Sequence, residues 1–444
     1  MRLVRLMRRL VPVLGVLLWL AACMSDQGLP LPRQPALAPS VASLRHQGVA
    51  LGGRLSVADI ARLTVQNDPD LLAMQAQHGV AQAQLLQAGL LPNPQISGAF
   101  LPLLAGFGTT NAFNAGFTED IRALITLRSR RRTAAAAASQ VDAQLLWQAW
   151  QAVGQARLLA VDIIKGDQSL RLLLAAEAML ADRSRRSQAA AAAGNATLVT
   201  LAPDLAALQS ARATALSQQG LQLQRRHALN ALLGLAPDAP LPLAGAPDLP
   251  PFDPASVLAA LPTLPERRPD LVALQMGYRA QEQKVRTAVL SQFPNFLLGV
   301  SGGSDNVNTR VVGPQAALEL PLFDRNQGNI AIERATRQQL HDEYAARLSA
   351  ADGQVRAMVS EMALQARQLA AVRADLTGVK SAAARATAAL ASGNIDERSY
   401  VDLVSARIAK EQEIVTIELA QLERRVAIAT LVGAGMPPIA LPPQ

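Results

Sequence analysis

Alternating apolar and polar positions predict short strands at several places along the chain. The apolar or small residues of these stretches form three series: Phe113, Ala115, Phe117 and Ile121; Phe296, Leu298 and Val300; and Ala316, Leu318, Leu320 and Leu322. A period of two indicates strands with two different faces. Each run is about ten residues long, which suits a tilted membrane strand. Segments rich in Gly, Asn and Thr at Ala105–Asn111 and Gly302–Thr309 predict exposed hairpin loops.

Long segments rich in Ala, Gln, Arg and Leu predict helices on either side of the strands. Two of them are very long, 129–192 and 326–392, and four are shorter: 69–91, 197–234, 267–291 and 396–433. The first long helix would span about 96 Å at 1.5 Å per residue, whereas the mean helix has about 11–12 residues. In each half the summed length of the two shorter helices is close to the length of the long helix. Short helices stacked end to end along a long one would form the wall of a hollow helical tube.

The order of these elements repeats, and so do short motifs. Asn67-Asp68-Pro69-Asp70-Leu71 returns as Arg267-Arg268-Pro269-Asp270-Leu271, and Gly194-Asn195 returns as Gly393-Asn394. We therefore expect a tandem duplication. The expected segments are a signal peptide (1–22), a tether (23–54), a first repeat (55–235), a Pro-rich linker with one short helix (236–265), a second repeat (266–434) and a tail (435–444).

The predicted fold class is mainly α with a small transmembrane β part. Beyond the signal the sequence has no apolar run long enough for a membrane helix, so any membrane crossing must use strands. Four strands per chain cannot close a barrel, and open sheet edges are not tolerated in lipid. Other copies must therefore complete the sheet, and three chains would supply a twelve-stranded barrel.

The first residues predict export from the cytoplasm. Four arginines (Arg2, Arg5, Arg8 and Arg9) precede a short apolar run that ends at Leu20-Ala21-Ala22-Cys23, as in a bacterial secretory signal. Cys23 is the only cysteine, so no disulfide forms within one chain. The alternative is an ordinary signal with a chance cysteine at its end. The net charge of +8 includes those four arginines. The remaining basic residues are scattered apart from Arg128–Arg132, and export argues against a nucleic-acid partner.

Several motifs together resemble one known family. They are Asn67-x-Pro69-Asp70-Leu71, Ala88-Gly89-Leu90-Leu91-Pro92-Asn93-Pro94, Leu320-Pro321-Leu322-Phe323-Asp324-Arg325-Asn326-Gln327-Gly328, and Gly393-Asn394 followed by a helix ending at Gly433. This order resembles the TolC family of outer-membrane efflux factors over 55–434. The resemblance implies a homotrimer in outer-membrane lipid that continues as a long periplasmic α-barrel.

The family's partners and anchor are also implied by the resemblance. They are a periplasmic adaptor (membrane fusion) protein and a proton-driven inner-membrane pump. Leu-Ala-Ala-Cys resembles a lipobox, with Cys23 lipidated, and Met24 after it favours the outer membrane. The stretch 320–328 is most similar to the heavy-metal branch, so metal cations are the favoured cargo over drugs or other small molecules.

By the same resemblance, the working parts lie at two helix–turn–helix tips. The tips that would contact the adaptor are Gly194-Asn195 and Gly393-Asn394. The family places gate carboxylates just after the second tip, where this sequence has Asp402, with Asp396 and Glu397 close by. The inner gate position is Ser399. The family's Tyr before that tip and basic residue after it are replaced by Leu390 and Ile395.

Other functions have weaker support in the sequence. Gly299-Val300-Ser301-Gly302-Gly303 matches G-x-S-x-G, with Asp305 or Asp324 and then His341 in hydrolase order, but a nucleophile elbow needs a strand that turns into a helix. His46, His78, His227 and His341 are too scattered to predict a metal site. We expect no cofactor, no nucleotide-binding loop and no enzymatic activity. The second alternative is a periplasmic coiled-coil lipoprotein that spaces the envelope layers.

Overall fold

The computed structural model describes residues 28–50 and 53–439. The predicted signal peptide (1–22), the predicted lipidation site Cys23 and the end of the predicted tail (440–444) lie outside the described residues. The chain divides into two units at Leu37/Ala38. In the first unit the described residues, 28–37, are exposed and have no helix or strand. The second unit, which begins at Ala38, contains every helix and strand discussed below.

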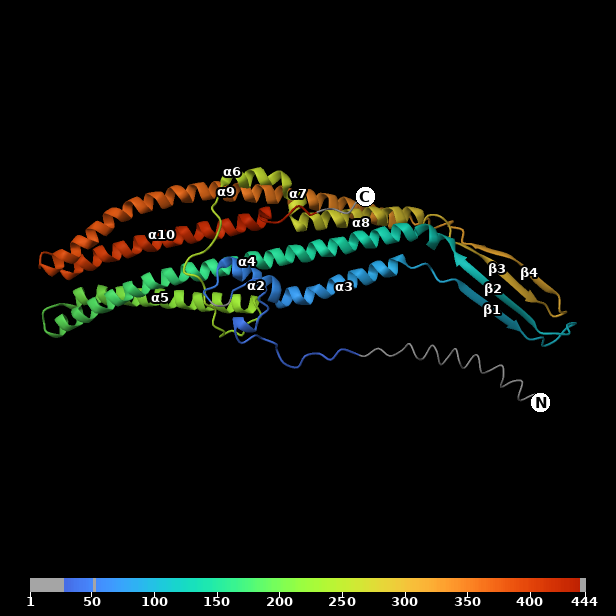
Figure 1. The fold of residues 1–444 in the computed structure, drawn as a ribbon, viewed down its shortest axis with the longest axis horizontal. Coiled ribbons are helices and arrows are strands. Elements are labelled where there is room, and N and C mark those ends of the chain that lie inside the picture. The colour runs from blue at the N-terminus through green and yellow to red at the C-terminus, as the bar shows by residue number, and fades with distance from the viewer. Residues whose placement is uncertain (1–27, 51–52, 440–444) are drawn as a thin grey trace. The chain divides into compact units, whose positions relative to one another are not determined.

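The same order of elements occurs twice in the second unit, as helix, two strands, long helix, helix (Figure 1). The first set is α3 (Pro69–Gly89), β1 (Gln95–Leu101), β2 (Ala112–Asp120), α4 (Ile121–Ala192) and α5 (Leu198–Leu232). The second set is α8 (Pro269–Leu290), β3 (Phe296–Ser304), β4 (Arg310–Leu318), α9 (Gln327–Ala391) and α10 (Glu397–Val432). The helix α2 (Val57–Asn67) precedes the first set, and α6 (Pro254–Ala260), a 3-10 turn (Leu261–Thr263) and α7 (Leu264–Arg267) join the two.

The long helices organise the packing. Both α3 and α5 pack against α4, and both α8 and α10 pack against α9. The predicted end-to-end arrangement of two short helices along one long helix is therefore correct. Because α4 also packs against α8 and α10, it joins the two sets into one helical layer. The order α3, α4, α8, α9 follows the order of the strands to which these helices connect.

The four strands form one antiparallel sheet in the order β1-β2-β3-β4. Three boundaries differ from the sequence prediction. Ile121 belongs to α4 and not to a strand, because the Asp120 carboxylate accepts a hydrogen bond from Ala123 N (2.9 Å) and caps the helix there; α4 consequently begins eight residues before the predicted 129. Leu320 and Leu322 also lie outside the sheet.

The third difference concerns the β3–β4 loop. Gly302 and Gly303 pair with Val312 and Val311, so they belong to β3 and not to the predicted loop. The end of β4 at Leu318 has a simple cause. Its partner strand β3 begins only at Phe296, after Pro294, and Pro321 has no N–H with which to continue the ladder.

The main apolar core lies where α2, α4 and α5 meet the chain before α2 and the linker. Its fully buried side chains include Ile60, Leu63, Val161, Leu229 and Leu233. Within the predicted tether, Val41, Leu44 and Val49 are buried in this core. Two backbone bridges border this core, one from Ala38 to Leu235 at the end of the first repeat and one from Leu55 to Leu243 in the linker. A second core joins α8, α9 and α10 through Leu264, Leu271 and Val355, among others.

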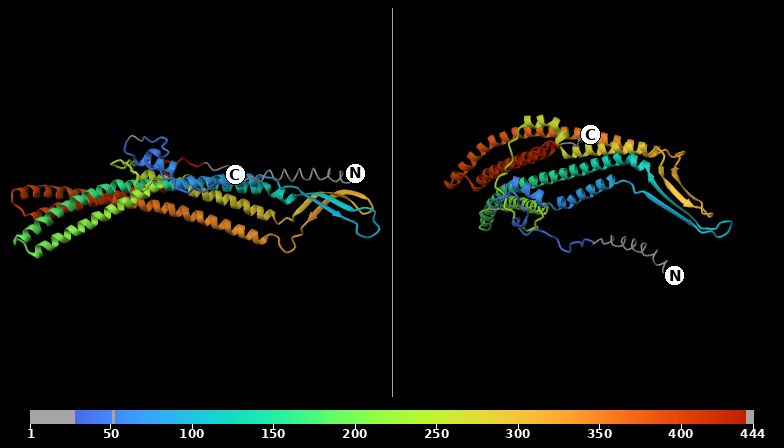
Figure 2. Two further views of the ribbon diagram at one scale, coloured as in Figure 1. Left: turned by 90° about the horizontal axis from the view of Figure 1, so that it is seen from below. Right: turned by 45° about the vertical axis from the view of Figure 1, so that its right-hand side comes forward.

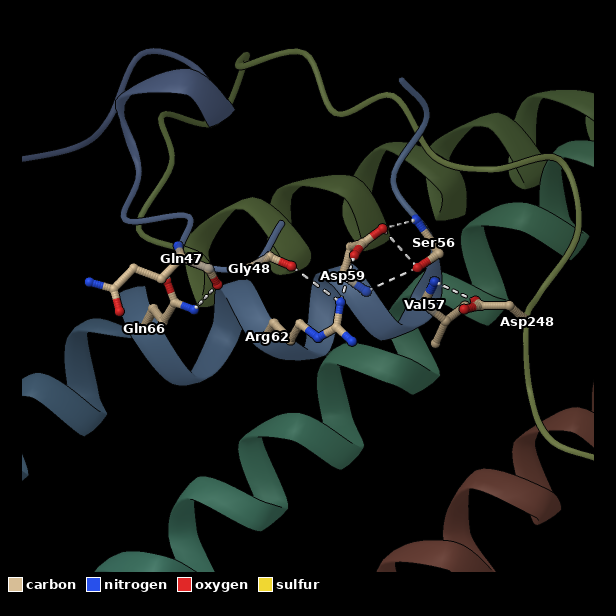
Figure 3. A network of polar contacts seen from close by, with 8 residues as sticks. All are labelled: Gln47, Gly48, Ser56, Val57, Asp59, Arg62, Gln66 and Asp248. Carbon is tan, nitrogen blue, oxygen red and sulfur yellow. Dashed lines mark hydrogen bonds and ion pairs between the residues drawn. The ribbon is translucent and has the colours of Figure 1, made fainter. Parts of the chain in front are cut away.

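A polar network fixes α2 next to the linker (Figure 3). Ser56 and Asp59 form a capping box, in which Asp59 N donates to Ser56 Oγ (3.0 Å) and Ser56 N donates to Asp59 Oδ2 (3.1 Å). The carboxylate of Asp248, on the linker, accepts a hydrogen bond from Val57 N at 2.6 Å. Three of the donors at the start of α2 are thus satisfied, two by its own cap and one by the linker.

Two carboxyl groups share a half-buried place between α4 and α10. Burial and the adjacent Asp162 raise the pKa of Glu423 to about 7, although the positive charges of Arg225 and Arg424 lower it in part. Burial raises the pKa of Asp162 as well. Its Oδ1 is buried and accepts no hydrogen bond, while Oδ2 lies 3.4 Å from Arg225 Nε of α5. Arg424 is itself held by Glu361 of α9 at 2.8 Å. One proton shared by the two carboxyl groups would satisfy this arrangement.

We expect the thermal stability of the purified protein to fall as pH rises through this range. The ordinary pKa of a glutamate is 4.5, whereas the pKa of Glu423 in the folded protein is about 7, so the folded state binds this proton more tightly than the unfolded state. Protonated Glu423 therefore adds to the free energy of unfolding in full below pH 4.5, and this stabilisation is lost as the pH rises to about 7. The unfolding midpoint, followed by circular dichroism, should decrease over that interval. Glu423→Gln should remove part of the dependence, whereas Glu413→Gln, on the exposed side of the same helix, should leave it unchanged. Equal slopes in all three proteins would contradict the prediction.

Candidate functional site

The sheet has one apolar and one polar face. Residues opposite one another in an antiparallel pair share a face, and the register places Phe117 beside both Ile96 and Val300. The large apolar side chains on that face are the half-buried Phe296 and eight that are exposed: Ile96, Phe100, Phe113, Phe117, Leu298, Val300, Val312 and Leu318. Two charged residues share the face, Glu119 near the helices and Arg310 near the loops. The opposite face carries Ser97, Asn114, Thr118, Ser301 and Gln315, with apolar Leu101 and Val311 near the loops and Leu297 near the helices. No described helix covers the apolar face.

The sheet also has two free edges. β1 and β4 each pair on one side only, so both present backbone donors and acceptors to their surroundings. Exposed, apolar edge strands pair readily with another chain. An uncovered apolar face of this size indicates an interaction with lipid or protein. No helix within the described ranges combines the length and the apolar character that are needed to cross a membrane.

At the opposite end of the helices lie two hairpin tips (Figures 1 and 2). One joins α4 to α5 and the other joins α9 to α10. Gly194 and Gly393 have φ values of +77° and +71°, which favour glycine because a side chain is strained there. In each tip the next residue closes the helix: Asn195 N donates to Ala190 O and Asn394 N donates to Ala389 O, both at 2.8 Å. These are Schellman caps, and they fix the predicted tip residues Gly194, Asn195, Gly393 and Asn394 at two matching turns.

Behind the first tip, a buried ion pair joins α4 to α5. Arg183 Nη2 lies 2.6 Å from Asp204 Oδ1, and the two side chains are 10% and 7% exposed. Ser187 Oγ also donates to Asp204. Burial raises the pKa of Asp204, but the hydrogen bonds from Arg183 and Ser187 and the charges of Arg183 and Arg398 outweigh it and hold that pKa below its ordinary value. Asp204 therefore remains charged, and the pair locks the hairpin.

The acidic residues predicted near the second tip face this pair. Asp402 Oδ1 lies 3.5 Å from Arg183 Nη1, with the Asp402 side chain 69% exposed, and Glu397 lies 3.3 Å from Arg186. Asp396 caps α10 by accepting a hydrogen bond from Ser399 N, and the hydrogen bonds from Ser399 lower its pKa. Arg183 thus contacts a buried carboxylate of its own hairpin and an exposed carboxylate of the other hairpin. The structure brings all three predicted acidic residues to one end of the molecule.

The basic side of this network was not predicted from the sequence. Arg183 and Arg186 lie on α4 shortly before Gly194, and Asp204 lies on α5 shortly after it. Arg183 stands eleven residues before its glycine and Asp204 ten residues after it, so the two lie side by side once the chain reverses. That symmetric spacing around the tip glycine was the signal that could have found the pair.

The residues of the hydrolase alternative do not form a site. Ser301 lies in the middle of β3 between Gly116 and Gly313, so the strand-to-helix turn of a nucleophile elbow is absent there. The Asp305 carboxylate accepts hydrogen bonds from Val307 N and Thr309 N in the β3–β4 turn. His341 contacts Asp342, its chain neighbour. In the part of the chain that the structure describes, no three His, Cys, Asp or Glu side chains gather as a metal site.

Comparison with known proteins agrees with this architecture. The family model "Outer membrane efflux protein" matches residues 260–434. No curated protein sequence matches the chain. Among solved structures, the fold is similar to the outer membrane channel CmeC of Campylobacter jejuni, with a TM-score of 0.71 and 14% identity over 93% of this chain and 94% of that one. It is similar to the open state of the outer membrane channel MtrE of Neisseria gonorrhoeae, with a TM-score of 0.67 and 17% identity over 92% and 98%.

A third similar structure is that of CusC, which is described as undergoing conformational changes that accompany folding and transmembrane channel formation. Its TM-score is 0.66 at 18% identity, over 91% of this chain and 99% of that one. At such identities the likeness concerns the fold, and it extends over nearly the full length of each relative. The predicted resemblance is confirmed: residues 260–434 match the model of the outer membrane efflux protein family, and nearly the whole chain has a fold similar to that of the outer membrane channels CmeC, MtrE and CusC.

Proposed function

We propose that this chain is one subunit of a trimeric channel that crosses the outer membrane and forms the exit duct of a tripartite efflux system. The main support for this proposal is the four-stranded sheet. Its exposed apolar face is fit to contact lipid, and its polar face is fit to line an aqueous lumen. Three copies would pair their free edges and supply twelve strands, because an open edge is not tolerated in lipid. The helices that continue from the strands would then enclose a periplasmic duct.

The two hairpin tips are the proposed periplasmic end of this duct. Gly194, Asn195, Gly393 and Asn394 would contact a periplasmic adaptor protein, which in turn would engage a proton-driven inner-membrane pump. Asp402, Asp396 and Glu397 would form the gate, with Asp402 in a three-fold ring. A ring of like charges resists closure unless each charge is paired, and the contact between Asp402 and Arg183 at 3.5 Å supplies a pairing. The duct performs no covalent chemistry.

Anchor and cargo complete the proposal. Lipidation of Cys23 would tether each subunit to the inner leaflet of the outer membrane. The resemblance of 320–328 to the heavy-metal branch favours heavy-metal cations as the cargo. Since the described residues hold no metal-ligand cluster, selection of the cargo would rest with the pump, and the duct would only conduct.

The proposal predicts opposite tolerance to charge at two adjacent residues of β3. Val300 lies on the apolar face, where an arginine in lipid costs about 2–4 kcal/mol near the bilayer midplane. Ser301 lies on the polar face between Gly116 and Gly313, where an arginine would reach the aqueous lumen. Val300→Arg should therefore abolish recovery of the protein in the outer-membrane fraction, whereas Ser301→Arg should be recovered like wild type. Equal recovery of both variants would contradict a lipid-facing apolar face.

A further inference from the structure

A cavity of about 560 Å³ lies beneath the Pro-rich linker, away from both the sheet and the tips. Its walls are largely apolar and come from the linker, α6 and α10, including Pro250, Phe252, Val257, Val426 and Val432. This volume falls in the range of small-molecule sites, which are apolar clefts with a few fixed polar groups. The cavity owes its shape to the linker, which crosses α10 between the two repeats.

Three guanidinium groups line the cavity, and none of them forms an ion pair with a carboxylate of the described residues. Arg267 makes no hydrogen bond there, and its Nε is buried without a partner. Arg425 donates only to backbone carbonyls, those of Leu249 and Pro250, and burial lowers its pKa. The guanidinium of Arg157 lies over the ring of Trp150, 5.7 Å from the ring centroid. Burial lowers the pKa of Arg157, and the charge of Asp248 offsets this only in part.

The two acidic residues at the cavity are already engaged elsewhere. The Asp248 carboxylate accepts the hydrogen bond from Val57 N at 2.6 Å (Figure 3). Asp253 caps α6 by accepting from Ala255 N and Ser256 N, and its pKa is lowered by the hydrogen bonds of Ser256 and Ala255. Three cations against two anions leave one positive charge. Elsewhere in the helical layer, by contrast, Arg183, Arg225 and Lys165 each contact a carboxylate.

We propose that this cavity binds a small amphipathic monoanion, with an apolar body between the linker and α10 and one anionic head against Arg267 and Arg425. A carboxylate, sulfonate or phosphate diester is a monoanion that supplies the acceptor oxygens a guanidinium fork matches. An apolar body would replace water along the proline and valine walls. Binding would hold the linker on α10 and thereby join the two repeats. The inference does not depend on the proposed channel function, because it concerns a cavity formed within one chain.

The test uses two probes that differ only in charge. The first is 1-anilinonaphthalene-8-sulfonate, and the second is N-phenyl-1-naphthylamine, which has the same rings without the sulfonate. The full-length protein is held in a lipid nanodisc without detergent, and binding is followed by energy transfer from tryptophan, since Trp150 lies beside Arg157. We expect the anionic probe to bind once per chain and about tenfold more tightly than the neutral one, as one charge-assisted contact allows.

The variants assign the binding to this cavity. Arg267→Met should weaken the anionic probe about tenfold without weakening the neutral one, and Arg267→Lys should retain part of the difference. Arg267 makes no hydrogen bond among the described residues, so its replacement should not unfold the chain, which the thermal midpoint checks. Arg347→Met removes a distant arginine that pairs with Glu343 and should change neither probe. Equal affinity for the two probes, no binding, or an equal loss in Arg347→Met would overturn the proposal.

Discussion

Replacing Gly299 by alanine is expected to prevent the sheet from forming, although the change adds a single methyl group. A Cβ at this position would lie 1.9 Å from Phe117 O and 2.8 Å from Phe117 C. Both atoms belong to the backbone of the neighbouring strand β2, so neither can rotate away. Overpacking of a formed structure usually costs about 1–3 kcal/mol and sometimes more, and a clash with a paired backbone falls at or above the upper end. β3 would have to separate from β2, which would divide the sheet between the two repeats.

The measurement is the yield of the proposed trimer by size-exclusion chromatography with light scattering. Gly313→Ala is the matched control, because it lies in the neighbouring strand of the same sheet and a Cβ there meets nothing within 4 Å. We expect the control to assemble like wild type and Gly299→Ala to yield no oligomer. Assembly of both variants at wild-type yield would mean that β2 and β3 are not paired in this register.

Arg183→Ala is expected to have the second largest effect, at the opposite end of the molecule. Removing the guanidinium leaves Asp204 buried and charged with only Ser187 as a side-chain donor. Loss of one partner of a buried pair typically costs about 3–5 kcal/mol, which should be concentrated in the hairpin of α4 and α5. The exposed contact to Asp402 disappears as well, and it contributes about 0–1 kcal/mol. Amide hydrogen exchange near Gly194 should accelerate, while exchange in the sheet should not change.

Two further variants separate the buried pair from a general loss of charge. Arg185 lies two residues away, is 75% exposed and pairs with Asp182, so Arg185→Ala should leave exchange at the tip nearly unchanged. The double variant Arg183→Met, Asp204→Leu replaces both charges by apolar side chains and should restore most of the protection. Unchanged exchange in Arg183→Ala would contradict the assignment of this pair as the lock of the hairpin.

The elements that could be read from the sequence are those with a repeated local pattern. The alternation of Phe113, Ala115 and Phe117 marks β2 because its two faces meet different environments. The tip glycines were found because a left-handed residue leaves few other choices. The helix α2 was missed, although Ser56 and Asp59 carry the spacing of a capping box, because its eleven residues are short beside the helices around it.

What the sequence does not reveal depends on contacts between distant segments. The pair of Arg183 and Asp204 requires knowing how α4 and α5 lie after the chain reverses. The end of β4 at Leu318 depends on where its partner β3 begins, and Leu320 continues the alternation without a strand to pair with. The three arginines of the linker cavity, which form no ion pair among the described residues, come from α4, α7 and α10, and no local pattern joins them.

Single-channel conductance in a planar bilayer tests the central claim most directly. The purified full-length protein is added to a lipid bilayer, and the current is recorded at fixed voltage, with Val300→Arg as the matched negative control. A trimeric duct predicts discrete, uniform current steps for the wild type and none for the variant. A wild-type protein that is folded by circular dichroism yet never produces a step would contradict the channel and favour a periplasmic spacer built from the same helices.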